Sequence, residues 1–147
     1  MSNIDFNIDS YAALAAAYRF IGDLKRAENF SKSVLILNPK KAAAYNELGI
    51  VYKQTGRYKE AEEAFKKGIA AEPDNFTIIN NYAMFLFQEQ HKIDEAVRIL
   101  EQNVQRNPDE PDMLQNLATF YHQQGDMKKA NQYLRRLRRA RSSVSGI

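Results

Sequence analysis

The amino-acid sequence predicts an all-α fold, in which four helix-turn-helix units stack into a solenoid. Pro39, Pro73 and Pro108 recur at intervals of 34 and 35 residues, and each lies between segments with the apolar spacing of helices. Glycine recurs with nearly the same period within these segments. When the segments are superposed, four copies match position by position. We therefore expect a repeat protein rather than a globular fold with a single centre.

The repeat period divides residues 1–147, taken as a single domain, into four units. The units span residues 8–41, 42–75, 76–110 and 111–144. The first helix of each unit begins its apolar pattern with one large residue, and two more follow three and seven positions later. Residues with this spacing lie on one face of a helix. These positions hold Tyr11, Leu14 and Tyr18; Tyr45, Leu48 and Tyr52; Ile79, Tyr82 and Leu86; and Leu114, Leu117 and Tyr121. Because one hairpin cannot cover its own apolar stripe, neighbouring units are expected to stack.

A turn and a second helix complete each unit. Gly22, Gly56 and Gly125 stand in three of the turns, because a helix that reverses direction ends most easily on a residue that tolerates positive φ. The third unit has Gln90-His91-Lys92 there, with one extra residue. In the second helix of each unit, a small residue allows the two helices of the hairpin to approach closely. Four residues later, three of the units have a large apolar residue. These positions hold Ala27, Ala61, Ala96 and Ala130, and then Ser31, Phe65, Leu100 and Leu134, of which Ser31 is a weak substitute.

The composition is that of an ordered, soluble chain. Hydrophobic residues make up 44% and charged residues 27%, with six glycines and four prolines. The absence of cysteine excludes disulfides, thiolate metal sites and a thiol nucleophile. Residues 1–10 contain Asp5 and Asp9 but no basic residue, so they do not resemble a signal peptide. With no apolar run near the roughly 18 residues of a membrane span, we expect a cytoplasmic protein, unless a leader was removed.

The second unit resembles the tetratricopeptide (TPR) repeat. It matches the family pattern at positions Tyr45, Leu48, Gly49, Tyr52, Gly56, Ala61, Phe65 and Pro73. It departs from the pattern at Gly68, where the family usually has alanine. The resemblance extends over the four units and implies a right-handed superhelix whose concave face is lined by the first helices. It also implies that the protein binds other proteins.

The resemblance assigns a set of candidate peptide-binding residues to the concave groove. They are Arg19, Phe20, Asn46, Ile50, Lys53, Gln54, Asn80, Asn81, Met84, Phe87, Gln115, Asn116, Thr119 and His122. Carboxamides both donate and accept hydrogen bonds, so the asparagines can pair with the main chain of an extended peptide whatever its sequence. The apolar members provide contact surface. The alternative interpretation is that asparagine is simply common at these positions, or that the chain itself covers the apolar ones.

The first helix is rich in alanine, which makes its surface smooth. Alanine occupies positions 12, 13, 15, 16 and 17. Ile4, Phe6 and Ile8 could fold back onto this surface, or a second copy of the chain could dock there. A third interpretation is that the alanines only stabilise an exposed helix. A self-associating scaffold is therefore the main alternative to a peptide-binding module.

The last helix concentrates positive charge. Seven basic residues and no acidic one lie between Lys128 and Arg141, in a chain of net charge +3. Candidate anion-binding residues are Arg135, Arg136, Arg138, Arg139 and Arg141. Nucleic acid or anionic lipid is thus a third class of partner, although the one nearby aromatic residue, Tyr133, is expected to face the core. The plainer interpretation is a solubilising end of the array.

The sequence offers little for catalysis. The two histidines, His91 and His122, lie in different units, and neither they nor the carboxylates show metal-ligand spacing. No glycine-rich phosphate loop is present. We therefore predict a non-catalytic module without cofactor or metal, which holds an extended peptide or a helix of a partner protein within a larger assembly.

Overall fold

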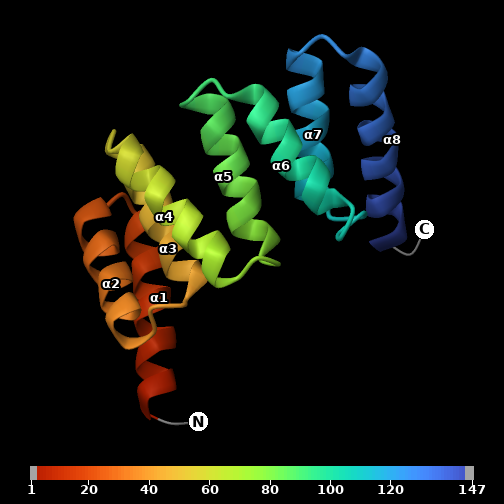
Figure 1. Cartoon of the computed structure of the whole chain (residues 1–147). Coiled ribbons are helices and arrows are strands. Elements are labelled where there is room, and N and C mark those ends of the chain that lie inside the picture. Colours follow the sequence, from red (N-terminus) through yellow and green to blue (C-terminus); the bar gives the residue numbers. More distant parts are fainter. Residues whose placement is uncertain (1–2, 145–147) are drawn as a thin grey trace. The chain divides into compact units, whose positions relative to one another are not determined.

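The computed structural model describes the backbone of residues 3–144, and the side chains of residues 7–143. Every regular element in this range is a helix, so the predicted all-α fold is confirmed (Figure 1). The helices are α1 (Asn3–Phe20), α2 (Leu24–Leu37), α3 (Ala42–Gln54), α4 (Tyr58–Ala71), α5 (Phe76–Gln88), α6 (Ile93–Val104), α7 (Pro111–Gln123) and α8 (Met127–Val144).

The helices follow the predicted units, with one difference at the start. The last three predicted units contain the pairs α3 and α4, α5 and α6, and α7 and α8. Helix α1 begins at Asn3, five residues before the expected boundary, so the backbone of residues 3–7 extends the helix and does not fold back over it. The side chains of Ile4 and Phe6 lie outside the described residues. Ile8 is buried and packs with Val34 and Ala44.

The chain divides into two compact units, Met1–Asn81 and Tyr82–Ile147, which we call unit 1 and unit 2. The sequence-based assignment of one domain with four repeats stays a prediction. The division falls within α5, which is understandable because each hairpin of a repeat array contacts only its neighbours and no central core holds the whole chain together. The two units are described separately below.

Short turns join the helices of three hairpins in the same way. Gly22, Gly56 and Gly125 have φ values of 87°, 75° and 83°, as predicted. The residue after each glycine donates its N–H to a carbonyl five residues earlier, on Tyr18, Tyr52 and Tyr121 respectively. This is the Schellman arrangement, which satisfies carbonyls that the helix leaves open at its end. In Figure 1, α1 and α2 accordingly run antiparallel on either side of such a turn.

The core lies between the helices of each unit, on the apolar stripe that the repeat period predicts. Leu48, Tyr52 and Phe65 are buried in unit 1, and Leu117 is buried in unit 2. Two residues at apolar positions of the repeat are not buried: Leu14 is 39% exposed and Leu134 is 40% exposed. Helix α1 packs on α2 and α3, and α8 packs on α7. Helices α1 and α8 are therefore the outermost helices of their units among the described residues, and each keeps an exposed face.

Candidate functional site

Side-chain contacts link the first helices of neighbouring repeats in unit 1. The guanidinium of Arg19, on α1, donates from Nε to Glu47 Oε2 at 2.5 Å and from Nη2 to Glu47 Oε1 at 3.3 Å. Asn81 Nδ2, on α5, donates to Asn46 Oδ1 at 2.9 Å. Glu47 and Asn46 are adjacent on α3, so the two contacts connect α1, α3 and α5. We call the surface formed by α1, α3 and the part of α5 that belongs to unit 1, residues 76–81, the A-helix face.

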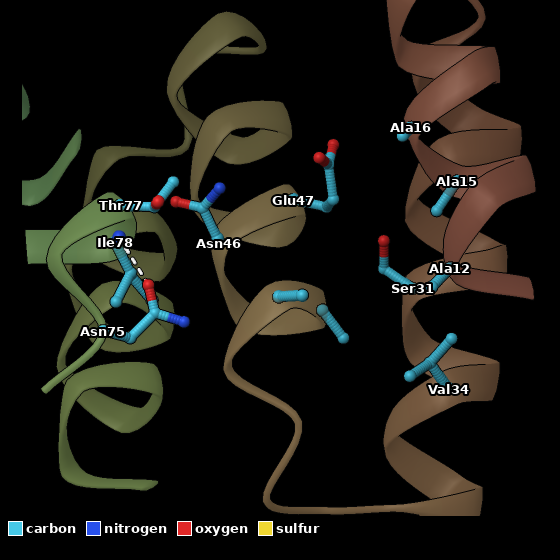
Figure 2. Close-up of a pocket in the computed structure, with 12 residues that line it drawn as sticks. Ala12, Ala15, Ala16, Ser31, Val34, Asn46, Glu47, Asn75, Thr77 and Ile78 are labelled. Carbon is cyan, nitrogen blue, oxygen red and sulfur yellow. Dashed lines mark hydrogen bonds between the residues drawn. The ribbon is translucent and has the colours of Figure 1, made fainter. Parts of the chain in front are cut away.

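A cavity of 290 Å³ opens on the A-helix face of unit 1 (Figure 2). Its apolar wall comes mainly from alanines of α1 and α3, and polar side chains stand at its other side. The lining residues are Ala12, Ala15, Ala16, Ser31, Val34, Ala43, Ala44, Asn46, Glu47, Asn75, Thr77 and Ile78. The alanine-rich surface of the first helix, which the sequence left with three interpretations, thus provides part of a concave site. The site has the apolar walls and few polar groups typical of ligand pockets.

The polar residues at the cavity keep part of their hydrogen-bonding capacity. Asn75 Oδ1 accepts the N–H of Ile78 at 3.3 Å, which caps the start of α5 and is the contact drawn in Figure 2. Its Nδ2 group makes no hydrogen bond with the described residues, and the same holds for Nδ2 of Asn46. Both amides can therefore donate to the carbonyl groups of a bound peptide.

The predicted groove residues of unit 1 differ widely in accessibility. Phe20 is 88% exposed and Gln54 is exposed, whereas Arg19, Asn46, Ile50, Lys53 and Asn81 are half-buried. Asn80 is only 6% exposed. Adjacent residues of a helix point about 100° apart, so Asn80 turns inward where Asn81 reaches Asn46. The role of Asn80 in a peptide-binding groove stays a prediction.

The predicted groove residues of unit 2 lie on α5 and α7. Met84, Phe87 and Asn116 are half-buried, while Gln115, Thr119 and His122 are exposed. Phe87 packs against Phe120, with ring centroids 4.7 Å apart, and the Thr119 hydroxyl donates to the Gln115 carbonyl at 3.0 Å. A single groove that includes both groups of residues stays a prediction.

The arginines of α8 are partly used within unit 2. Arg136 is half-buried, donates to the Pro108 carbonyl at 3.0 Å and lies 5.2 Å from the centre of the Tyr133 ring. Arg141 donates to Gln115 Oε1 at 3.4 Å. Arg135, Arg138 and Arg139 are exposed. Tyr133 is buried, as the repeat register predicts, so it offers no stacking surface to a nucleic-acid base.

Ser31 is the site residue that sequence reasoning missed. It was treated only as a weak substitute for a large apolar side chain, yet it is fully buried and lines the cavity. The signal was present in the alignment of the repeats, where a small polar residue replaces a large apolar one at a core position. Such a replacement predicts either a local cavity or a rearranged core.

The described residues also bear on metal binding and on membrane insertion. No group of three or more histidine, aspartate or glutamate side chains that could hold a metal ion occurs among them. None of the helices there is both long enough and apolar enough to cross a membrane.

Comparison with known proteins gives one family and several relatives. The family model described as the Cytochrome c-type biogenesis protein H TPR domain matches residues 10–142. The chain is similar to the Type IV pilus assembly protein PilF of Pseudomonas aeruginosa, with 26% identity over 141 residues, 93% of this chain and 56% of PilF. It therefore spans little more than half the length of that relative.

The chain is also similar to solved structures, among them PilF and MamA. A structure of Pseudomonas aeruginosa PilF superposes with a TM-score of 0.86 at 26% identity, over 95% of this chain and 63% of PilF. A crystal structure of MamA superposes with a TM-score of 0.79 at 18% identity, over 96% of this chain and 82% of MamA. At that identity the MamA structure supports the fold alone.

Proposed function

The chain belongs to the tetratricopeptide repeat family, and on that premise we propose that it is a non-catalytic module that binds an extended segment of a partner protein on its A-helix face. Homologues with this fold are in general protein-interaction scaffolds. The relative PilF is named as a pilus assembly protein, which supports a role as adaptor within a larger protein assembly.

The contacts that connect α1, α3 and α5 carry this proposal. Arg19 with Glu47, and Asn46 with Asn81, hold four polar side chains in place on the A-helix face before any partner arrives. Binding then orders fewer side chains, which lowers the entropic cost of association. The amide donors of Asn46 and Asn75 stand beside the cavity, where an extended main chain can reach both.

The proposal is tested by selecting peptides from a random peptide library on the immobilised chain and measuring their affinity by calorimetry. We expect Asn46→Ala and Asn81→Ala each to weaken a selected peptide about tenfold, the effect of one or two lost hydrogen bonds. Asn29→Ala, on the exposed side of α2, is the matched control and should leave the affinity unchanged. Equal affinity for all four proteins would reject the A-helix face as the binding site.

Self-association is the second candidate function, and exposed apolar side chains on unit 1 favour it. Phe20 and Ile21 at the end of α1, and Ile36 at the end of α2, are all more than half exposed. Apolar residues at such positions can bury surface against a second copy of the chain. Light scattering over a range of concentrations separates this function from peptide binding by a monomer.

Binding of nucleic acid or anionic lipid through α8 remains a third proposal. The exposed Arg135, Arg138 and Arg139 support it. Affinity for a single-stranded oligonucleotide should then fall steeply as salt is added. Replacement of these three arginines by glutamine should abolish it.

A further inference from the structure

Helix α8 carries an accessible groove on its surface. The groove has a volume of 550 Å³, and its lining residues are Leu134, Leu137, Arg138, Arg141 and Ser142. All of them belong to α8, and the neighbour of α8 in unit 2 is α7 (Figure 1). Leu137 is 4% exposed and forms the floor, whereas Leu134 is 40% exposed. A molecule that approaches α8 can therefore touch Leu134 and the two exposed arginines beside it.

The position of Leu134 is fully buried in the three earlier repeats. Ser31, Phe65 and Leu100 occupy it there, and each of them is 0% exposed. In the earlier repeats the first helix of the next repeat packs on the second helix, as α3 does on α2 and α7 on α6. No helix follows α8 among the described residues. A helix from another molecule can therefore take the place on α8 that α7 takes on α6.

Two positions beside Leu134 indicate the charge that such a helix needs. The first position holds Leu35, Ile69 and Val104 in the earlier repeats and Arg138 in the last. The second position holds Asn38, Glu72 and Asn107, and then Arg141. Arg138 forms no ion pair with the described residues, and Arg141 donates to the neutral Gln115 Oε1 at 3.4 Å. Helix α8 itself contains no acidic residue. Two positive charges without a carboxylate partner among the described residues therefore border the apolar surface.

We propose that α8 binds an acidic amphipathic helix of a partner protein, as a second interaction surface in addition to the A-helix face. The apolar stripe of the partner helix packs on Leu134 and on Met127, which is 48% exposed and lies about two turns earlier on the same side of α8. Aspartate or glutamate beside that stripe pairs with Arg138 and Arg141. Because α8 has 18 residues, it is roughly 27 Å long and can contact about five turns of a partner helix.

Other partners fit this face less well. A nucleic-acid strand would use the arginines but gain little from Leu134 and Met127, because phosphates supply most of its affinity and its bases stack on aromatic rings. The aromatic residue of α8, Tyr133, is buried. An anionic membrane surface would be attracted equally by Arg135 and Arg139, which lie outside the groove. A neutral or basic helix would leave the arginines of the groove without partners.

The experiment uses a synthetic peptide of about 18 residues, with leucines at helical spacing on one face and glutamates beside them. Calorimetry measures its affinity for the whole chain, and ¹H–¹⁵N NMR identifies the contacted residues. We expect shifts at the amides of Met127, Leu134 and Arg138. A peptide of the same composition, shuffled so that no apolar face forms, should bind about tenfold more weakly. Equal affinity for the two peptides, or shifts confined to residues outside α8, would overturn the proposal.

Variants of α8 separate the apolar contact from the charge. Leu134→Ala should weaken the peptide about tenfold, and the loss should persist in about 0.5 M salt; Met127→Ala serves the same purpose if that variant does not fold. Arg138→Glu should weaken the peptide about fivefold at low salt and much less at high salt.

Arg139→Glu is the matched control for Arg138→Glu. It makes the same change of charge at the adjacent residue, which is also exposed but points about 100° away around the helix. We expect it to change the affinity less than about twofold. Equal losses in the two variants would show a general attraction to the charge of α8 and would refute the assigned face.

The remaining outcomes assign the groove to another occupant or the peptide to another site. If a single-stranded oligonucleotide shifts the same amides and binds Leu134→Ala as tightly as the natural chain, the face binds nucleic acid and the proposal is wrong. It is also wrong if the natural chain self-associates and Leu134→Ala abolishes the association, because the occupant is then a second copy. Asn46→Ala should leave the affinity for the acidic peptide unchanged. If Asn46→Ala weakens it as much as Leu134→Ala does, the peptide binds the A-helix face, and the proposal for α8 fails while the proposed function stands.

Discussion

A methyl group on Gly68 would lie 2.2 Å from Cδ1 of Ile78 and 2.9 Å from Cβ of Tyr45. These distances are far below van der Waals contact, so the helices pack closely here only because glycine has no side chain. We expect Gly68→Ala, which restores the usual TPR residue, to lower the free energy of unfolding by about 1–3 kcal/mol through overpacking. Alanine also favours the helix by about 1 kcal/mol relative to glycine. We expect the loss from overpacking to be larger than this gain. Urea denaturation measures the difference.

Ile78→Val provides the control for this prediction, because it removes the Cδ1 atom that a methyl on Gly68 would meet. The cost of Gly68→Ala should therefore be smaller in the Ile78→Val background than in the natural sequence. Strictly additive effects would show that Ile78 is not the obstacle.

His91 adopts a φ of 55°, the left-handed conformation that glycine adopts in the other three turns. The one-residue insertion shifts this turn, so Lys92 donates its N–H to the carbonyl of Leu86, six residues earlier, at 2.8 Å. A residue with a Cβ atom costs about 1 kcal/mol in this conformation. We expect His91→Gly to raise the free energy of unfolding by up to about that amount, as measured by urea or thermal denaturation.

The neighbouring position is the matched control for the His91 variant. Gln90 does not have positive φ, so Gln90→Gly gains no relief of strain and only makes the unfolded chain more flexible. It should destabilise the protein by a few tenths of a kcal/mol to about 1 kcal/mol. Destabilisation by His91→Gly as well would show that the histidine side chain contributes more than its backbone strain costs.

Among the helices of unit 2, one carboxylate connects three elements. Glu101 Oε1, on α6, accepts the hydroxyl of Tyr121 on α7 at 2.6 Å and the hydroxyl of Tyr133 on α8 at 2.7 Å. The two rings stack with centroids 5.8 Å apart. Burial, followed by the hydrogen bond to Glu101 and its negative charge, raises the pKa of each tyrosine well above its ordinary value of 10.

This cluster predicts a loss of stability at high pH. Below pH 10 both the folded and the unfolded chain keep the two phenolic protons. Above pH 10 the unfolded chain loses them first, so it binds fewer protons than the folded chain and stability falls as the pH rises. The slope is at most about 1.4 kcal/mol per pH unit for each tyrosine.

Urea midpoints between pH 9 and 11 test this prediction. The doubly substituted Tyr121→Phe/Tyr133→Phe protein should show a shallower decline than the natural sequence, and either single variant should fall between them. Identical slopes in all four proteins would mean that the two hydroxyls titrate alike in the folded and unfolded chains.

The repeat period predicted the helices and their buried faces well, whereas the assignment of the peptide-binding residues stays a prediction. A repeat period specifies which face of a helix is apolar, so the burial of Leu48, Phe65 and Leu117 followed from it. It does not specify what covers that face, so the exposure of Leu14 was not predicted. The period also could not show that a cavity would open between α1, α3 and α5, because cavity formation depends on how closely the surrounding helices pack.

At the scale of the whole molecule, charge and exposed apolar surface decide whether the chain associates with itself. The net charge of +3 is modest and arises from the basic end, since the remainder of the chain is acidic overall. The exposed apolar residues Phe20 and Ile21 stand at one end of the first hairpin, and Ile36 and Leu37 stand at the other, because α1 and α2 are antiparallel. The apolar surface at the ends of this hairpin is thus divided between two separate places.

We therefore expect the protein to be monomeric. A stable interface buries about 1,600 Å² in total, more than two neighbouring side chains at a helix end can supply. Light scattering should give a mass near 16.9 kDa at every concentration from the micromolar range to about 0.5 mM. A mass that rises with concentration in the natural protein, and stays constant in Phe20→Asp, would establish self-association through the end of α1. If the mass still rises with concentration in Phe20→Asp, another surface of the protein associates. The arginines of α8 would then be the first residues to replace.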